Sequence, residues 1–205
     1  MLFRSEEADA LLVSVRRRPL PPADMSRIKS FIRSGKPVLG IRTASHAFCL
    51  RGKAPPEGLQ DWEQFDAEVF GGSYTNHHGN QLVTKVSVAS DARHSLIATK
   101  DRGDELFESQ GSLYKVSPLR PGAEVLWKGV IPNEPSEPVA WTFVRNDSGR
   151  SFYTSLGHAS DFENDQFSAL LLNAAYWLTE KETRVTAGAI EHQQHMVRRG
   201  EGKQR

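Results

Sequence analysis

The sequence predicts an α/β fold, because a strand–helix–strand unit lies near its start and paired strands followed by a helix lie near its end. Residues 8–15 and 37–41 are short apolar runs typical of buried strands, and an amphipathic segment separates them. A crossover of this length places its two strands parallel and is almost always right-handed. We therefore expect a doubly wound, mainly parallel sheet flanked by helices.

The segment between the first two strands has the signals of a helix. Pro22 suits the first helical position, and Gly35 stands where a left-handed C-terminal cap is expected. The apolar residues that recur at helical spacing are Met25, Ile28, Phe31 and Ile32.

The middle of the chain is less regular. Residues 61–70 read as an amphipathic helix that ends at Gly71-Gly72, and residues 73–80 read as a loop. Three strands are expected beyond this loop, around a polar segment at 101–108, and they cover residues 82–88, 113–116 and 124–127.

The last part of the pattern is clearer. Residues 138–144 and 151–156 are expected to pair, because the Asn, Asp and Gly residues between them suit a hairpin turn. Residues 165–178 follow with apolar residues on one helical face. We expect one domain over residues 1–180 and a charged, exposed tail over residues 181–205.

Composition limits the possible partners. The chain has 205 residues, 38% of them hydrophobic and 25% charged, with a net charge of +1. This balance favours a soluble domain and gives no electrostatic reason to expect nucleic acid or an anionic membrane surface. No apolar run approaches a membrane span, and the first residues lack a signal-peptide pattern. A single cysteine leaves the compartment open, and nothing in the pattern indicates the oligomeric state.

Two strand ends carry the chemistry that the sequence offers. The run Lys36–Ile41 leads into Arg42, and the run Phe152–Leu156 leads into Gly157 and His158. The carboxyl ends of parallel strands meet at one edge of a sheet, where ligands bind. We therefore expect the functional site at this edge.

These motifs resemble the ThuA-like (trehalose-utilisation) family, and the resemblance runs from about residue 8 to residue 178. It rests on His94 and on the segments 40–44, 70–77, 104–106, 138–141 and 149–158. The resemblance implies the fold of class I glutamine amidotransferases. Members of the family begin with a strand and a helix that this chain lacks, which implies either that Met1 lies downstream of the true start or that the remaining strands close up.

The resemblance places Arg42 where the amidotransferases carry their nucleophilic cysteine. A guanidinium stays protonated and donates hydrogen bonds, so glutaminase chemistry is not expected here. Cys49 lies seven residues further on, between Phe48 and Leu50, in an expected helix where a buried thiol would be inert. Arg42 could hold a carboxylate, a phosphate or a sugar oxygen, or form an internal ion pair.

His158 occupies the position where the resemblance puts the amidotransferase base. It could transfer a proton, bind a ligand or serve a structural role. Asp161 follows closely and could orient it, or could cap a helix.

Further contacts to a ligand are expected from the loops. The candidates are Tyr74, His77, His46 and the carboxylates of Asp104 and Glu105. Tyr74 could stack on a sugar. For Asp104 and Glu105 the alternative is a turn that caps the following segment. His78 is expected to face solvent. The histidines could bind zinc, but no His-x-x-x-His or Cys-x-x-Cys pattern supports a metal, and no cofactor is identified.

Two classes of function follow from the resemblance. The first is an enzyme or enzyme subunit that acts on a sugar or oxidised sugar, with Arg42 holding the substrate and His158 transferring a proton. The second is a non-catalytic module that binds a carbohydrate or a protein partner through the same cleft. Metal-dependent hydrolysis would require bound zinc.

Overall fold

The protein is described by a computed structural model, which defines residues 7–97 and 101–180. Its largest element is a sheet of seven strands in the order β1-β2-β9-β8-β7-β4-β5. The strands are β1 Leu11–Val13, β2 Val38–Ile41, β4 Thr84–Val88, β5 Glu105–Ser109, β7 Ala123–Val130, β8 Glu137–Val144 and β9 Arg150–Thr154. A separate pair is formed by β3 (Asn76–His77) and β6 (Tyr114–Lys115).

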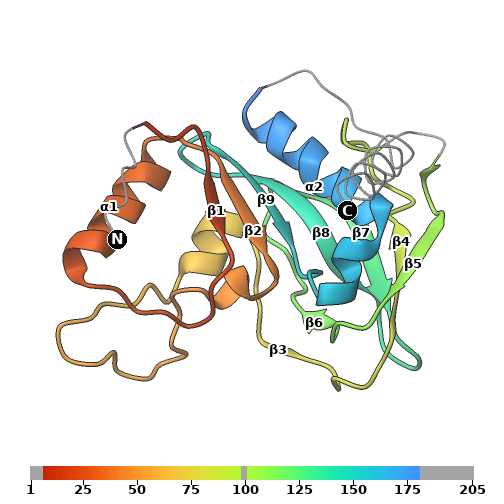
Figure 1. Cartoon of the computed structure of the whole chain (residues 1–205), viewed down its shortest axis with the longest axis horizontal. Coiled ribbons are helices and arrows are strands. Elements are labelled where there is room, and N and C mark those ends of the chain that lie inside the picture. The colour runs from red at the N-terminus through yellow and green to blue at the C-terminus, as the bar shows by residue number, and fades with distance from the viewer. Residues whose placement is uncertain (1–6, 98–100, 181–205) are drawn as a thin grey trace, which may run out of the picture.

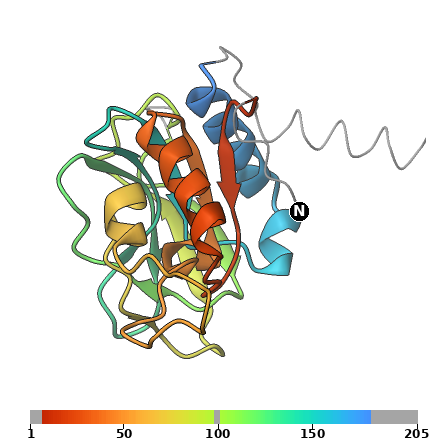
Figure 2. The same ribbon diagram turned by 90° about the vertical axis from the view of Figure 1, so that its left-hand side faces the viewer.

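Helices cover both faces of the sheet (Figure 1). Helix α1 (Pro22–Arg33) and the single turn η2 (Asp66–Phe70) lie on one face, and helix α2 (Asp165–Leu178) lies on the other (Figure 2). The short turns η1 (Arg42–His46) and η4 (Ala159–Glu163) follow β2 and β9 directly. No helix in the described part of the chain is both long and apolar enough to cross a membrane.

The two cores follow from the alternation of side chains along the central strands. Val38 of β2 and Tyr153 of β9 pack with α1 and η2, whereas their neighbours Leu39 and Phe152 pack with α2. Trp141, fully buried, donates a hydrogen bond from its indole nitrogen to the Phe70 carbonyl at 2.7 Å, which ties η2 to the sheet. Strands that are apolar on both faces therefore belong in the middle of this three-layer fold.

The sheet is mixed, which corrects the expectation of a mainly parallel one. Strand β1 pairs parallel to β2, and β2 pairs parallel to β9. The other four pairs of the sheet are antiparallel. The reason is local: short connections join β7 to β8 and β8 to β9, and a short connection reverses the chain direction.

Several expected elements are present. Helix α2 has the bounds that its periodicity predicts, and the β8–β9 hairpin forms across residues 145–149. Gly35, just beyond α1, has the left-handed φ of +83° expected of a residue that ends a helix. The strand–helix–strand unit at the start of the chain is confirmed.

Two expectations need correction. The helix expected over residues 61–70 is limited to one π-helical turn at Asp66–Phe70, and Trp62 before it donates its backbone N–H to the Phe48 carbonyl, which ties this segment to the loop after η1. The polar segment 101–108 contains most of strand β5. This strand lies at the edge of the sheet and pairs only with β4 among the described strands, so its exposed residues Glu105 and Glu108 do not need to be apolar. The predicted tail 181–205, with His192 and His195, lies outside the described residues.

Candidate functional site

The site is built at the edge of the sheet where β2 and β9 both end. Ile41 and Thr154, the last residues of these strands, are register partners. Arg42 follows β2 at once, with a φ of +51°. The left-handed region disfavours any residue with a Cβ, by about 1–2 kcal/mol. The chain thus turns sharply at Arg42.

Three contacts hold this elbow. The Tyr153 hydroxyl donates to the Arg42 carbonyl at 2.6 Å, and the Arg42 Nη1 donates to the Ser155 carbonyl at 3.2 Å. The guanidinium carbon lies 5.4 Å from the centre of the Tyr114 ring, a cation–π distance. The internal ion pair considered for Arg42 is not formed with any carboxylate that the structure describes. Its charge therefore remains uncompensated by a described partner.

The loop that carries His158 lies against the elbow. A Cβ added to Gly157 would lie 2.8 Å from Ile41 Cγ2 and 3.6 Å from Arg42 Cβ, and the φ of Gly157 is +122°. His158 itself is exposed, and its Nδ1 lies 2.8 Å from the Ser160 hydroxyl oxygen. Its Nε2 has no hydrogen-bond partner among the described residues, so this nitrogen can face a ligand.

Asp161 organises the backbone of this loop and not the imidazole ring. Its Oδ2 accepts hydrogen bonds from the backbone N–H groups of Gly157 at 2.8 Å and His158 at 2.9 Å. The residue is 1% exposed, and its Oδ1 is buried without a hydrogen-bond partner. The capping role considered for Asp161 is therefore what the geometry shows, because it closes a capping box with His158 at the start of η4. Ser160 orients the ring instead.

His46 and Tyr74 form a stacked pair beside the elbow. Their ring centres are 4.4 Å apart and their planes differ by 17°. His46 is 3% exposed, and burial together with the charges of nearby arginines lowers its pKa to about 4. It is neutral at physiological pH and supports Tyr74 from below the surface. Tyr74, which is half-buried, is the member of the pair that a ligand can reach.

His77 lies at the exposed side of the same group of rings. It pairs with Tyr114 across β3 and β6, and the two ring centres are 6.3 Å apart. Its Nδ1 is 2.7 Å from the His78 carbonyl oxygen, consistent with a hydrogen bond. His78, expected to face solvent, is 9% exposed and lies 3.6 Å from a Glu134 oxygen. That expectation is corrected because the β3–β6 pair turns His78 inward.

Sequence reasoning missed the residues that complete this surface. Tyr114 touches Arg42, His46, Tyr74 and His77, although it is far from all four in the sequence. Arg51 lies 5.4 Å from the Tyr74 ring centre. Arg16 and Arg17 follow β1, and the Arg17 N–H donates to the His46 carbonyl at 2.9 Å. The arginine run directly after the first strand was the one available signal.

Asp104 and Glu105 are not brought to the elbow. The edge of the sheet that carries the elbow is formed, in this part of the sheet, by the start of β4 and the end of β5. Glu105 is at the start of β5 and pairs with Ser87 near the end of β4, so it lies at the opposite edge. Both residues are exposed, and the Asp104 N–H donates to the Asp101 carbonyl in a turn. The turn considered as the alternative is found for Asp104, whereas Glu105 is the first residue of β5.

Cys49 lies in a loop, which corrects the expected helix. Its thiol is partly exposed and lies 3.2 Å from a Glu63 carboxylate oxygen. Partial burial and the Glu63 carboxylate raise the pKa of the thiol, which disfavours the reactive thiolate. In the part of the chain that the structure describes, no group of three or more His, Cys, Asp or Glu side chains is arranged to hold a metal ion.

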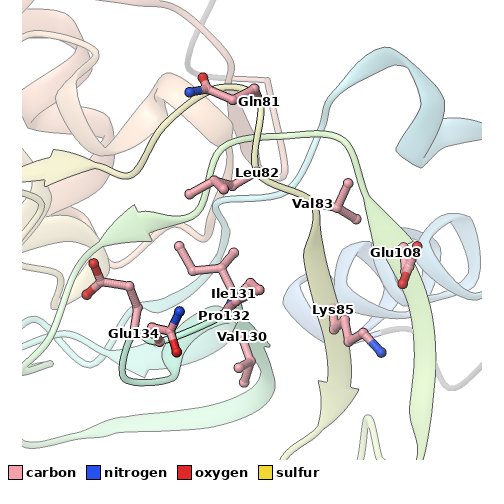
Figure 3. Close-up of a pocket in the computed structure, with 10 residues that line it drawn as sticks. Gln81, Leu82, Val83, Lys85, Glu108, Val130, Ile131, Pro132 and Glu134 are labelled. Carbon is pink, nitrogen blue, oxygen red and sulfur yellow. The ribbon is translucent and has the colours of Figure 1, made fainter.

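A separate hollow of about 480 Å³ opens further along the same edge of the sheet (Figure 3). It lies between the start of β4 and the β7–β8 connection, and much of its lining is apolar, with Leu82, Val130 and Ile131. Glu108 and Glu134 stand at its sides in Figure 3. None of the predicted site residues lines it, and no aromatic or histidine side chain is among its lining residues, whereas such rings gather beside the elbow. The elbow is therefore the better candidate for chemistry.

Comparisons with known proteins agree with this architecture. The ThuA-like protein from Bacteroides uniformis is 19% identical, with a TM-score of 0.60 over 85% of this chain and 71% of that one. The ThuA-like protein from Parabacteroides merdae is 17% identical, with a TM-score of 0.59 over 90% of this chain and 75% of that one. The cold-adapted β-galactosidase from Rahnella sp. R3 is 14% identical, with a TM-score of 0.55 over 86% of this chain but 23% of that one.

At these identities the structural likeness shows the fold alone. No curated protein matches the sequence. The family model described as "ThuA: Trehalose utilisation" matches residues 6–178, which is most of the chain. The sheet, the elbow at Arg42 and the loop at His158 all lie within that match, and the protein therefore belongs to the ThuA family.

Proposed function

We propose that the edge formed by the ends of β2 and β9 binds a sugar or oxidised sugar, and that the protein acts on it as an enzyme or enzyme subunit. The observation that carries the proposal is the contact between the Arg42 elbow and the Gly157–His158 loop. Two strands that end side by side bring Arg42 and His158 to the same edge of the sheet, where a ligand is expected to bind. The family description, trehalose utilisation, supports a sugar as the ligand class.

Each residue then has a defined task. Arg42 holds a sugar oxygen through charge-assisted hydrogen bonds. His158 accepts or donates a proton through Nε2, because Nδ1 is engaged by Ser160. Tyr74 and His77 contribute contacts from the neighbouring loop, with His46 supporting Tyr74 from behind. Amidotransferase thiol chemistry has no part in this proposal, because Arg42 stands where the thiol would be.

A thermal-shift screen tests the proposal with trehalose, glucose, keto-sugars and sugar acids. A ligand at a hundred times its Kd should stabilise the protein by about 2.7 kcal/mol, which is about 5–10 °C for a domain of this size. We expect His158→Ala to abolish turnover of the ligand found in the screen. The control is Lys53→Ala, at an exposed loop position. Binding that persists without turnover in either protein would favour the non-catalytic module, and no shift with any sugar would overturn both readings.

A further inference from the structure

Four arginines converge on the aromatic group beside the elbow, and we call Arg16, Arg17, Arg42 and Arg51 the arginine cluster. Arg42 lies 5.4 Å from the Tyr114 ring centre, and Arg51 lies 5.4 Å from that of Tyr74. The two tyrosine rings are themselves 4.8 Å apart. Burial raises the pKa of Tyr74, and the charges of all four arginines oppose that rise, which places each of them near this ring.

The backbone of the cluster is held in an unfavourable conformation. Arg17, Arg42 and Arg51 have φ values of +46°, +51° and +57°. They are three of the six non-glycine residues with positive φ in the described ranges. Strain of this kind persists where the surrounding structure enforces it, and it gathers at sites that bind ligands. The fold therefore holds three arginines of the cluster in one particular arrangement.

No ion pair in the described structure neutralises the positive charge of the cluster, and the carboxylate beside it, that of Glu63, accepts a hydrogen bond from the Gly52 N–H next to Arg51. None of the four arginines forms an ion pair with a described carboxylate. The charges that act on His46 are those of Arg17, Arg16, Arg51 and His77, and no carboxylate is among them. The Nε of Arg17 is buried and lacks a hydrogen-bond partner. The chain as a whole has a net charge of only +1, so this concentration of charge is a local feature.

Uncompensated arginines beside aromatic rings match one kind of ligand. Guanidinium groups bind carboxylates and phosphates through paired, charge-assisted hydrogen bonds, while tyrosine rings pack on the face of a sugar. Arg16 and Arg51 are exposed, and Arg17 and Arg42 are partly exposed, so an anion can reach the cluster from solvent.

We infer that the ligand of this site is an anionic sugar, carrying a carboxylate or a phosphate that the arginine cluster binds. The inference rests on the sugar site proposed above and adds the charge of the substrate. Arg42 belongs both to the proposed sugar site and to the arginine cluster, because it forms the elbow and its guanidinium lies beside the Tyr114 ring. Arg16, Arg17 and Arg51 are assigned here to recognition of the anion.

Isothermal titration of the full chain tests this inference with four ligands: glucose, glucuronate, glucose 6-phosphate and inorganic phosphate. Two variants remove one charge each, Arg16→Gln and Arg51→Gln. Arg27→Gln is the matched control, because Arg27 lies on the exposed side of α1 and pairs with Asp24. The melting temperature of each unliganded variant is recorded, so that loss of folding is separated from loss of binding.

We expect glucuronate or glucose 6-phosphate to bind at least tenfold more tightly than glucose. Each cluster variant should weaken that binding about tenfold, and the control should not, since a charge-assisted hydrogen bond is lost only in the cluster. Glucuronate and glucose 6-phosphate distinguish a carboxylate from a phosphate. Equal binding of glucose and the two anions would overturn the inference and leave the proposed function intact.

The remaining outcomes are also decisive. Binding of inorganic phosphate that requires Arg16, without binding of any sugar, would support the anion site and contradict the proposed sugar function. A short single-stranded RNA that binds more tightly than the sugar anions, and that loses affinity in Arg16→Gln, would overturn the inference in favour of nucleic acid. An equal loss in Arg27→Gln would show that the effect is general electrostatics and would also overturn it.

Discussion

Asp66 gives the sharpest prediction about stability. Burial raises the pKa of its carboxyl group to about 7 from a usual value of 3.8, although a hydrogen bond from the Tyr74 N–H opposes the rise. Its Oδ1 is buried and has no partner. The carboxyl group therefore prefers its neutral form in the folded protein, and its ionisation at higher pH costs stability.

The direction and size of the pH effect on stability follow from the difference in bound protons between the folded and unfolded protein. Between pH 3.8 and about 7 the folded protein holds a proton that the unfolded chain has released, so the free energy of unfolding falls as the pH rises. A shift of about three pKa units corresponds to an upper limit of about 4 kcal/mol. Asp66→Asn removes the charge and keeps an acceptor for the Tyr74 N–H. We expect the variant to match the wild type near pH 4 and to be about 2–4 kcal/mol more stable at pH 8.

Urea unfolding, followed by circular dichroism from pH 4 to pH 8, measures the difference between the two proteins. Taking the difference removes the contribution of other titrating groups such as His46. Asp91→Asn is the control, because this exposed carboxylate has a lowered pKa and titrates below the range studied. A difference between wild type and Asp66→Asn that stays constant across the range would refute the reasoning.

Three further predictions concern the site and the hairpin that supports it. Gly157→Ala should lower the free energy of unfolding by about 1–3 kcal/mol and sharply reduce ligand binding, because the new Cβ would meet Ile41. Gly58→Ala is the control: Gly58 also has a left-handed φ but open space around it, so this variant should lose only the free energy of backbone strain. Urea unfolding measures the stability of both variants, and titration measures their ligand binding. His46→Phe should become more stable than the wild type by up to about 3 kcal/mol as the pH falls from 6.5 to 4, because the unfolded chain protonates His46 in this range and the folded protein does not. Taking the difference cancels the opposite contribution of Asp66, and a difference that stays constant with pH would contradict this. Arg145→Lys should lower the free energy of unfolding by about 2–4 kcal/mol, because the buried guanidinium donates to four carbonyl and hydroxyl oxygens that an ammonium group cannot all reach. A thermal melt measures this loss, and an unchanged melting temperature would refute the prediction.

Local patterns predicted the elements that depend on neighbouring residues. The bounds of α2 follow from apolar residues at helical spacing, and the β8–β9 hairpin follows from an Asn, Asp and Gly turn between two apolar strands. Strand β5 was not expected, because an edge strand of the sheet can be polar on much of its surface. The direction of the outer strands was also missed, since strands β4, β5 and β7 read alike in a parallel and in an antiparallel sheet.

In the functional site, too, the sequence predicted the features that depend on neighbouring residues and missed those that depend on distant ones. Arg42 and His158 could be named as candidates because each follows a buried strand, and strand ends are where parallel sheets bind ligands. Asp104 and Glu105 were grouped with them, but β5 begins at the opposite edge of the sheet. Tyr114 could not be named, because its contacts are with residues far from it in the sequence.

By itself the sequence determined the strand–helix–strand unit, the hairpin, the last helix and the two strand ends at Arg42 and His158. These features depend on spacing within a few residues, which composition and periodicity record directly. Only the tertiary structure decided that the sheet is mixed, that Asp161 holds the His158 loop, and that the arginine cluster surrounds Tyr74. Such features depend on which distant segments pack together, and packing is set by the burial of whole surfaces, which no short stretch of sequence specifies.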